Sequence, residues 1–476
     1  MSNLPSTERL PVLQITRVSE TPEPNATSVH LSAGSRERLY YRAPVASKTA
    51  RGTKFFKFPV VKNGDGSPWA VACLYLLDRA KLRPLAMETL GSVAGDLAHY
   101  KSFLEEFEYE WDEFHSAEPY ALPTYQYRAH LLHLLKVGST SHGVASRRMA
   151  AVIAFYRHLQ KQERYGFRPA FSPWQDRSVS ITYKDAQGFE QSMGVKTTDI
   201  SIPVPNSSDP WDASIDDGAK LRPLPQTEQQ ALISALRELG NTEMSLMHET
   251  ALLTGARAQT ILTFRLKHFS RPPAQVASDY KLRCGPGTGI DTKRSKSGVY
   301  LTIPKLFYER LYTYAQSERA RRRREKSVLG DAEENYLFLT QHGKPYYEGV
   351  DERNSQREND ELLKSAKIAQ GLRNYILERV IPLVRKKLSN PDFSYRFHDL
   401  RATFGMNFVD FFEKEVEGNP EKRKWVMHQL RELMWHKNVQ TTMKYIDYRR
   451  NLHMLKSAEE GWGTHLIKLL SAREEK

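Results

Sequence analysis

Two short segments near the C-terminal end contain side chains that could act together on a phosphate ester. RFHDLRATF places His398 and Arg401 three residues apart, so on a helix the two side chains would share one face. LMWHKNVQTTMKYID then supplies His436 and Tyr445, which are nine residues apart. Either pair alone is common and usually structural, so the interpretation depends on the other reactive residues of the same region.

Two further cations precede these segments along the chain. In LLTGARAQTILTF, Arg257 lies at an expected turn between two helices. In TKRSKSGVYLTIP, either Lys293 or Lys296 could supply a lysine, and Lys296 is preferred because SKSGVYLTIP is typical of a turn followed by a strand. The C-terminal half therefore offers two arginines, a lysine, two histidines and a tyrosine in a defined order.

This combination suits the displacement of an alkoxide from a phosphodiester. The transition state carries extra negative charge on the non-bridging oxygens, and fixed cations aimed at these oxygens lower the barrier. Arg257 and Arg401 fit this task, because a guanidinium stays charged and its planar fork of donors matches phosphate oxygens. His436 would add a third donor.

The remaining residue types fit the proton transfers of the same reaction. Tyr445 is the expected nucleophile, and a phenol with an ordinary pKa of about 10 needs a general base, for which His398 is the candidate. Lys296 is the candidate acid for the leaving alkoxide oxygen, since nearby cations lower the pKa of an ammonium group. Tyr448 is the alternative nucleophile, but its distance from His436 fits less well.

The order of these segments resembles the tyrosine recombinase family, which includes the lambda-type integrases and the Xer recombinases. The family pattern is an Arg in a TGxR box, a Lys on a β-turn, an HxLR motif, a His or Trp before a TT segment, and a Tyr shortly afterwards. The resemblance covers about half of the chain, from Leu221 to the C-terminal tail, and is strongest in HDLR and WHKNVQTTMKY.

The resemblance implies a function, a set of partners and a fold. The function is a site-specific recombinase, or integrase, that joins Tyr445 to the DNA 3′-phosphate and frees a 5′-hydroxyl to attack the partner strand. No metal and no other cofactor is implied. The partners are double-stranded DNA, bound by a homotetramer on two sites, and accessory proteins. The fold is mainly α with a small antiparallel β-sheet: an N-terminal helical core-binding (SAM-like) domain followed by an α+β catalytic domain.

Two positions depart from the family pattern. Thr260 stands three positions after Arg257, where an acidic residue is usual, so the carboxylate that holds the cations in place is expected elsewhere in the chain. Trp435 stands where a small Gly commonly precedes the His. Neither departure removes a reacting group.

Composition agrees with a nucleic-acid partner. The 476 residues suffice for two or three domains, and their formal charge of +14 favours polyanions, with nucleic acid ahead of an anionic membrane. The polar N-terminus and the lack of an apolar run of about 20 residues predict a cytoplasmic, nucleoid-associated protein without membrane contact. Cys73 and Cys284 belong to no CxxC or Cys/His cluster, so no metal site is predicted.

Five segments are predicted along the chain. Residues 1–55 form an N-terminal arm without assigned structure, residues 56–166 a four-helix DNA-binding domain, and residues 167–220 a linker with an inserted hairpin. Residues 221–450 form the catalytic domain, in which FYERLYTYAQSERARRRREK is expected as one helix and ENYLFLT as a strand. Residues 451–476 are a tail that either packs on its own domain or, as the resemblance implies, docks on a neighbouring subunit.

Two basic groups are candidates for contacts with DNA phosphates. One lies on the last helix of the N-terminal domain and the other in an Arg run of the catalytic domain. A solvated helix face competes as an interpretation for both, and a cation cluster at a helix end for the second. The members are Arg147, Arg148, Arg157 and Lys161 in the first group, and Arg319, Arg321, Arg322, Arg323 and Arg324 in the second.

Two other functions compete with site-specific recombination. A type IB topoisomerase or a telomere-resolving enzyme would use the same chemistry to relax or resolve DNA. A non-catalytic DNA-binding accessory protein would need none of it, and the intact set of reactive residues argues against that alternative.

Overall fold

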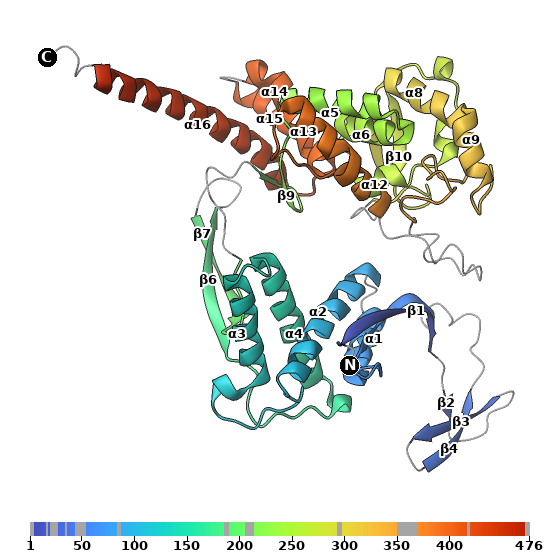
Figure 1. The fold of residues 1–476 in the computed structure, drawn as a ribbon, viewed down its shortest axis with the longest axis vertical. Coiled ribbons are helices and arrows are strands. Elements are labelled where there is room, and N and C mark those ends of the chain that lie inside the picture. The colour runs from blue at the N-terminus through green and yellow to red at the C-terminus, as the bar shows by residue number, and fades with distance from the viewer. Residues whose placement is uncertain are drawn as a thin grey trace. The chain divides into compact units, whose positions relative to one another are not determined.

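The chain divides into two compact units, Met1–Asn206 and Ser207–Lys476 (Figure 1). The computed structural model describes residues 4–15, 18–19, 27–33, 36–42, 54–82, 87–184, 190–204, 214–292, 298–349, 369–416 and 419–471. In this part of the chain both units are built mainly of helices, and every sheet is small and antiparallel. The predicted fold class, mainly α with small antiparallel sheets, is confirmed.

Four helices form the core of the first unit, as the apolar spacing predicts. Its centre is aromatic: Tyr100 and Tyr156 are fully buried and share a hydrogen bond of 2.8 Å between their hydroxyls. The last helix begins after Ser141, whose side chain accepts from the backbone N–H of Val144. The helices are α1 (Ala70–Leu82), α2 (Met87–Glu106), α3 (Pro123–Lys136) and α4 (His142–Lys161), with single 3-10 turns at Pro119–Ala121 and Glu163–Tyr165.

Strands flank this helical core on both sides in sequence. Although no structure was expected before residue 55, β1 (Ser6–Gln14) pairs antiparallel with β5 (Lys54–Lys62), placing Leu10 opposite Phe58. Phe58 and Val61 are buried with the helices, which explains why this strand pair forms. The other strands are β2 (Val18–Ser19), β3 (Thr27–Ala33) and β4 (Arg36–Arg42) in one sheet, and the hairpin of β6 (Asp176–Lys184) and β7 (Glu190–Thr198) in the segment expected to carry one.

In the second unit, the central helix pair α6 and α14 is surrounded by further helices and two hairpins. Its helices are α5 (Gln226–Leu239), α6 (Thr242–Thr254), α7 (Ala258–Leu262), α8 (Lys305–Gln316), α9 (Glu318–Glu325), α12 (Gln370–Tyr375), α13 (Ile381–Leu388), α14 (Asp399–Val416), α15 (Pro420–Met434) and α16 (Val439–Ser471). Single 3-10 turns at Leu266–Phe269 and Pro273–Gln275 and a π turn at Ile376–Val380 complete them. The hairpins join β8 (Ile215–Asp216) to β9 (Lys220–Leu221), and β10 (Tyr280–Cys284) to β11 (Val299–Ile303).

Two local predictions in this unit are wrong. The segment expected as one helix breaks at Ser317, because the Ser317 hydroxyl accepts from the backbone N–H of Ala320 and starts a new helix, α9. The segment expected as a strand around Tyr336 contains only isolated bridges, Arg265 with Tyr336 and Leu339 with Pro345. Both errors are local and leave the helical core unchanged.

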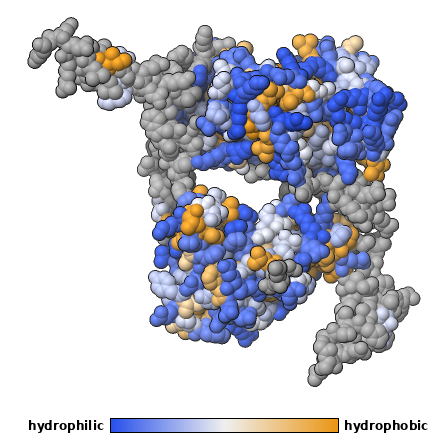
Figure 2. Space-filling model, viewed as in Figure 1, coloured by the Kyte–Doolittle hydropathy of each residue, from blue (hydrophilic) through white to orange (hydrophobic). Residues whose placement is uncertain are grey.

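The arginines of the run on α9 pair with carboxylates of the same unit. The surface over α8 and α9 is strongly hydrophilic (Figure 2). Arg319 and Arg323 both pair with Glu243, a fully buried carboxylate on α6. Arg324 is buried, pairs with Asp331 and donates to the carbonyl of Ala315, so its guanidinium is engaged within the unit.

The two outermost arginines of the run remain accessible. Arg321 pairs with Glu318 and Glu325, and Arg322 pairs with Glu318, while their side chains stay 51% and 72% exposed. The structure therefore favours a cation cluster in which two of the five arginines, Arg319 and Arg323, fasten α9 to α6.

We expect Glu243→Gln to lower the free energy of unfolding by about 2 kcal/mol, because it removes the charge of a buried carboxylate that Arg319 and Arg323 share as hydrogen-bond and ion-pair partner. Urea unfolding followed by far-UV circular dichroism measures the change. Glu318→Gln is the matched control, since Glu318 lies on the surface with the same two-arginine arrangement. Equal midpoints for both variants would contradict the structural role of Glu243.

Candidate active site

Arg257 is positioned by the turn that ends α6. Gly255 follows the helix with a φ of +64°, a left-handed conformation that favours glycine, and a Cβ there would lie 2.6 Å from the ring of Phe404. Arg257 comes two residues later and directly precedes α7. Its Nη2 lies 3.5 Å from Oδ1 of Asp217. The TGxR pattern therefore reflects a turn that only glycine fits.

Arg401 lies in the first turn of α14 with its guanidinium enclosed by the protein, and the residue is only 1% exposed. Its Nε donates to Oδ2 of Asp217 at 2.7 Å and its Nη1 to the carbonyl of Gly255 at 2.6 Å. Its Nη2 donates to the carbonyl of Met434, the last residue of α15. Arg401 thus ties three separate elements together around one point.

His436 follows α15 after a residue in an unusual conformation. Trp435 has a φ of +54°, a left-handed conformation that favours glycine, and its indole N–H donates to the carbonyl of Tyr300 at 3.0 Å. His436 Nε2 lies 3.1 Å from Oδ2 of Asp217, and Nδ1 lies 3.0 Å from the hydroxyl of Thr442. Burial lowers the pKa of His436, although its contact with Asp217 acts in the opposite direction.

Tyr445 lies near the start of α16 and is completely buried. Its hydroxyl donates to Oδ2 of Asp217 at 3.3 Å, and its ring stacks on His436 with 5.8 Å between ring centroids. The ring fits because residue 405 is glycine: a Cβ there would lie 2.4 Å from Cε1 of Tyr445. Burial, reinforced by the charge of Asp217, raises the pKa of the phenol well above its usual value.

The group on which all four side chains converge is Asp217, which the sequence analysis did not identify. It lies in the turn between β8 and β9, a segment assigned to the linker. Burial by itself would raise the pKa of Asp217, but the hydrogen bond from His436 and the charge of Arg401 outweigh it and hold the pKa well below its usual range. Asp217 is therefore an ionised carboxylate at the centre of the site.

Asp217 is the carboxylate that was expected elsewhere in the chain, because position 260 is occupied by Thr. The Thr260 hydroxyl donates to the carbonyl of Asp291 at 2.9 Å, so its side chain serves the backbone of a neighbouring loop. The carboxylate that meets the arginines comes instead from 40 residues before Arg257. The only sequence signal for it was the missing acid at position 260.

The other predicted residues stand differently towards this centre. His398 lies in the turn just before α14, so it precedes the helix that it was expected to share with Arg401, and its carbonyl accepts from the backbone N–H of Arg401 at 3.2 Å. Tyr448, the alternative nucleophile, packs at the edge of the cluster that contains Tyr445. Lys296 and Lys293 lie outside the described residues.

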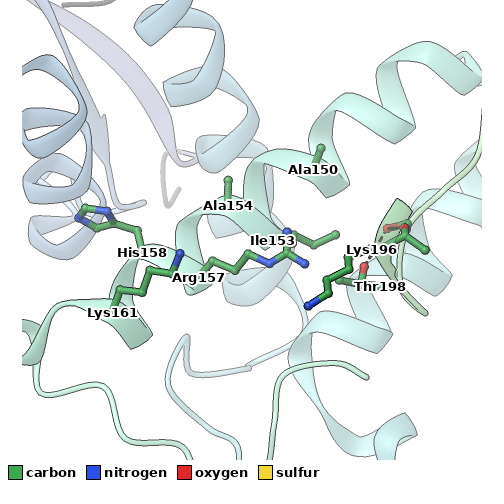
Figure 3. Close-up of a pocket in the computed structure, with 10 residues that line it drawn as sticks. Ala150, Ile153, Ala154, Arg157, His158, Lys161, Lys196 and Thr198 are labelled. Atoms are coloured by element: carbon green, nitrogen blue, oxygen red, sulfur yellow. Dashed lines mark hydrogen bonds between the residues drawn. The ribbon is translucent and has the colours of Figure 1, made fainter. Parts of the chain in front are cut away.

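The basic candidates on α4 are held at the surface of the first unit. Arg147 pairs with Asp96 at 2.7 Å, and Arg157 approaches Asp176 at 3.4 Å. Arg157 and Lys161 line one side of an open groove of about 430 Å³, and Lys196 of β7 lines the other (Figure 3). The hydroxyl-bearing residues of the groove are Thr197, Thr198 and Ser201. Arg148, the fourth candidate on α4, is half-buried.

The described residues contain no group of three or more His, Cys, Asp and Glu side chains arranged to hold a metal ion. Among them there is also no helix with both the length and the hydrophobicity that a membrane span requires.

Comparisons with known proteins give matches among solved structures. No family model and no curated protein matches the chain. The chain is similar to the XerH site-specific recombinase bound to its difH substrate, with 12% identity, a TM-score of 0.46, and coverage of 83% of this chain and 85% of the other. It is also similar to the Tn1549 transposon integrase in complex with transposon right-end DNA, with 15% identity, a TM-score of 0.41, and coverage of 82% of this chain and 99% of the other. A lambda integrase dimer bound to a core site matches with 13% identity, a TM-score of 0.39, and coverage of 80% of this chain and 95% of the other. All three are tyrosine recombinases.

The raised pKa of Tyr445 predicts a loss of stability in alkali. The folded protein favours the neutral phenol. The contribution of this phenol to the free energy of unfolding is therefore complete below pH 10 and decreases above it, because the phenol ionises in the unfolded chain. The difference in unfolding free energy between the wild type and Tyr445→Phe should therefore fall from pH 9 to pH 11, by up to about 1.4 kcal/mol per pH unit above pH 10.

Urea unfolding at closely spaced pH values measures this difference. Tyr300→Phe serves as the control, since it removes the hydroxyl of a tyrosine that is 61% exposed. A curve for Tyr445→Phe parallel to that of the wild type would contradict a buried phenol at this site.

Proposed function

We propose that the chain is a site-specific DNA recombinase that cleaves and rejoins strands through a phosphotyrosine at Tyr445. One observation carries the proposal: Arg257, Arg401, His436 and Tyr445 all approach the carboxylate of one residue, Asp217. A site that gathers three hydrogen-bond donors around an anionic oxygen is suited to a phosphate oxygen. The nucleophile of the reaction lies in the same group.

The proposed reaction balances without a redox step. The phenol oxygen of Tyr445 forms a bond to phosphorus while the bond from phosphorus to the 5′-oxygen breaks. The phenol proton passes to a base, for which His398 remains the candidate, and the 5′-oxygen takes a proton from Lys296. Because a phosphodiester is exchanged for a phosphotyrosyl ester, the 5′-hydroxyl of a partner strand can reverse the step on a new strand.

Double-stranded DNA is the proposed partner, and the first unit contributes its basic groove to binding. The groove brings Arg157 and Lys161 of α4 near Lys196 of β7, and such clusters attract phosphates by charge rather than by base sequence. We further propose that four copies act on two DNA sites, with accessory proteins as additional partners, in association with the nucleoid.

A nicked suicide substrate tests the chemistry directly. We expect the wild-type chain to form a covalent adduct with DNA carrying a nick near the cleavage site, since the short 5′-ended fragment diffuses away and prevents rejoining. Tyr445→Phe should abolish the adduct because it removes the nucleophile, and Tyr448→Phe should retain it. Denaturing gel electrophoresis measures the adduct.

The controls separate the competing functions. An adduct that survives Tyr445→Phe but not Tyr448→Phe would move the nucleophile to Tyr448. No adduct on libraries of native DNA would favour a non-catalytic accessory protein. Products joined between two sites indicate recombination, whereas relaxation of a single plasmid without such products would indicate a topoisomerase.

The groove on the first unit predicts a change in salt dependence. Lys161→Ala and Lys196→Ala should each reduce the slope of log binding constant against log salt concentration by about 0.9, because each contact with a phosphate of duplex DNA releases condensed counterions. Titration of labelled duplex at several salt concentrations measures the slope. Arg321→Gln is the charge-matched control, since Arg321 is already paired with Glu318 and Glu325. If the slope fell for Arg321→Gln but not for Lys161→Ala and Lys196→Ala, the groove would not be the DNA-binding surface.

A further inference from the structure

The hairpin of β8 and β9 covers the proposed nucleophile. Ile215 of β8 and Leu221 of β9 are buried in the same hydrophobic cluster as Tyr445. On its outer side, the Asp216 carboxylate lies 2.9 Å from Nζ of Lys444, the residue before the nucleophile. The hairpin is therefore packed on α16 by apolar contacts within and by an ion pair at the surface.

A single oxygen at the tip of this hairpin takes the central position of the site. Asp217 Oδ2 lies 2.7 Å from Nε of Arg401, 3.1 Å from Nε2 of His436 and 3.3 Å from the hydroxyl of Tyr445. A phosphate oxygen bound by the same three groups would have to occupy nearly the same point. The carboxylate and the phosphate cannot both be there.

Two other roles for Asp217 fit the geometry less well. A general base needs an appreciable affinity for protons, whereas the arginine and histidine contacts hold the pKa of Asp217 far below its usual range. A permanent brace for the arginines would keep its negative charge where the phosphate must enter. It would also leave Tyr445 fully buried and out of reach of DNA.

We propose that the β8–β9 hairpin is an internal plug whose Asp217 carboxylate stands in for a DNA phosphate, and that a phosphodiester must displace it before Tyr445 can react. The proposal rests on the proposed function, because it names the ligand of the same site as a phosphodiester group. The free chain is closed: Arg257 and Arg401 are paired with the Asp217 carboxylate and the nucleophile is covered.

Asp217→Asn tests the plug, because the amide has nearly the same shape without the negative charge. If the closed state predominates by tenfold in the wild type, the initial rate of adduct formation on the nicked substrate should rise by up to about tenfold. The affinity for inorganic phosphate, measured by calorimetry, should rise with it. Glu238→Gln, which removes an exposed carboxylate paired with Lys387 in the same unit, should change neither quantity.

A slower adduct with Asp217→Asn would overturn the proposal and make Asp217 a positioning residue that the active state retains. Unchanged phosphate affinity would overturn it as well. A third outcome is that neither the wild type nor Asp217→Asn forms an adduct, while the affinity of the variant for phosphate still rises. The hairpin would then block an anion-binding site, and the proposed recombinase function would be wrong.

Hydrogen exchange on the unmodified chain keeps the test decisive if Asp217→Asn does not fold. Addition of inorganic phosphate, or of the nicked duplex, should speed exchange in peptides that cover residues 214–222, because the hairpin leaves the site. Peptides of α5, which lie outside the proposed movement, provide the internal reference. Unchanged or slower exchange in the hairpin with saturating duplex would contradict displacement.

Discussion

The structure of the second unit depends on one electrostatic constraint: the cations buried at its centre require an anion. Arg401 is almost completely removed from water, and an unpaired guanidinium in such a place would cost several kcal/mol. Asp217 supplies the anion, and the backbone carbonyls of Gly255 and Met434 accept from the remaining edge of the guanidinium. The ends of α6 and α15 and the start of α14 consequently meet around a charge rather than around an apolar residue.

Local sequence patterns were sufficient for most of the helices and for the four side chains that meet at Asp217. Apolar spacing reports which residues face a core, and the short motifs report turns and helix starts within about ten residues. Asp217 was not predicted, because it lies 184 residues from Arg401 and 228 from Tyr445 in a Ser- and Asp-rich stretch that is typical of a linker. A contact over such a separation is decided by tertiary packing, which periodicity does not report.

The other failures have equally specific causes. Ser317 interrupts a run of helix formers because its hydroxyl competes for a backbone N–H. Two arginines of the run that follows, Arg319 and Arg323, pair with Glu243, a residue more than seventy positions away. The strand at Ser6–Gln14 was not predicted. Its partner strand begins only at Lys54, and each of the two strands contains a proline. Trp435 was identified as a departure, and the structure shows that it occupies a left-handed position with its indole bound to Tyr300.

Both the α9 arginines and the central arginines are paired with carboxylates, and this pairing has a consequence for kinetics. The chain carries a formal charge of +14, but several of its most concentrated positive groups are screened by carboxylates a few ångströms away. When a polyanion is about 8 Å away, which is the Debye length at physiological salt, such an ion pair attracts it only weakly, because the two opposite charges largely cancel. For the proposed recombinase, the rate of encounter with DNA and the rate of the chemical step would therefore depend on different sets of charges, so that substitutions would alter the two rates independently.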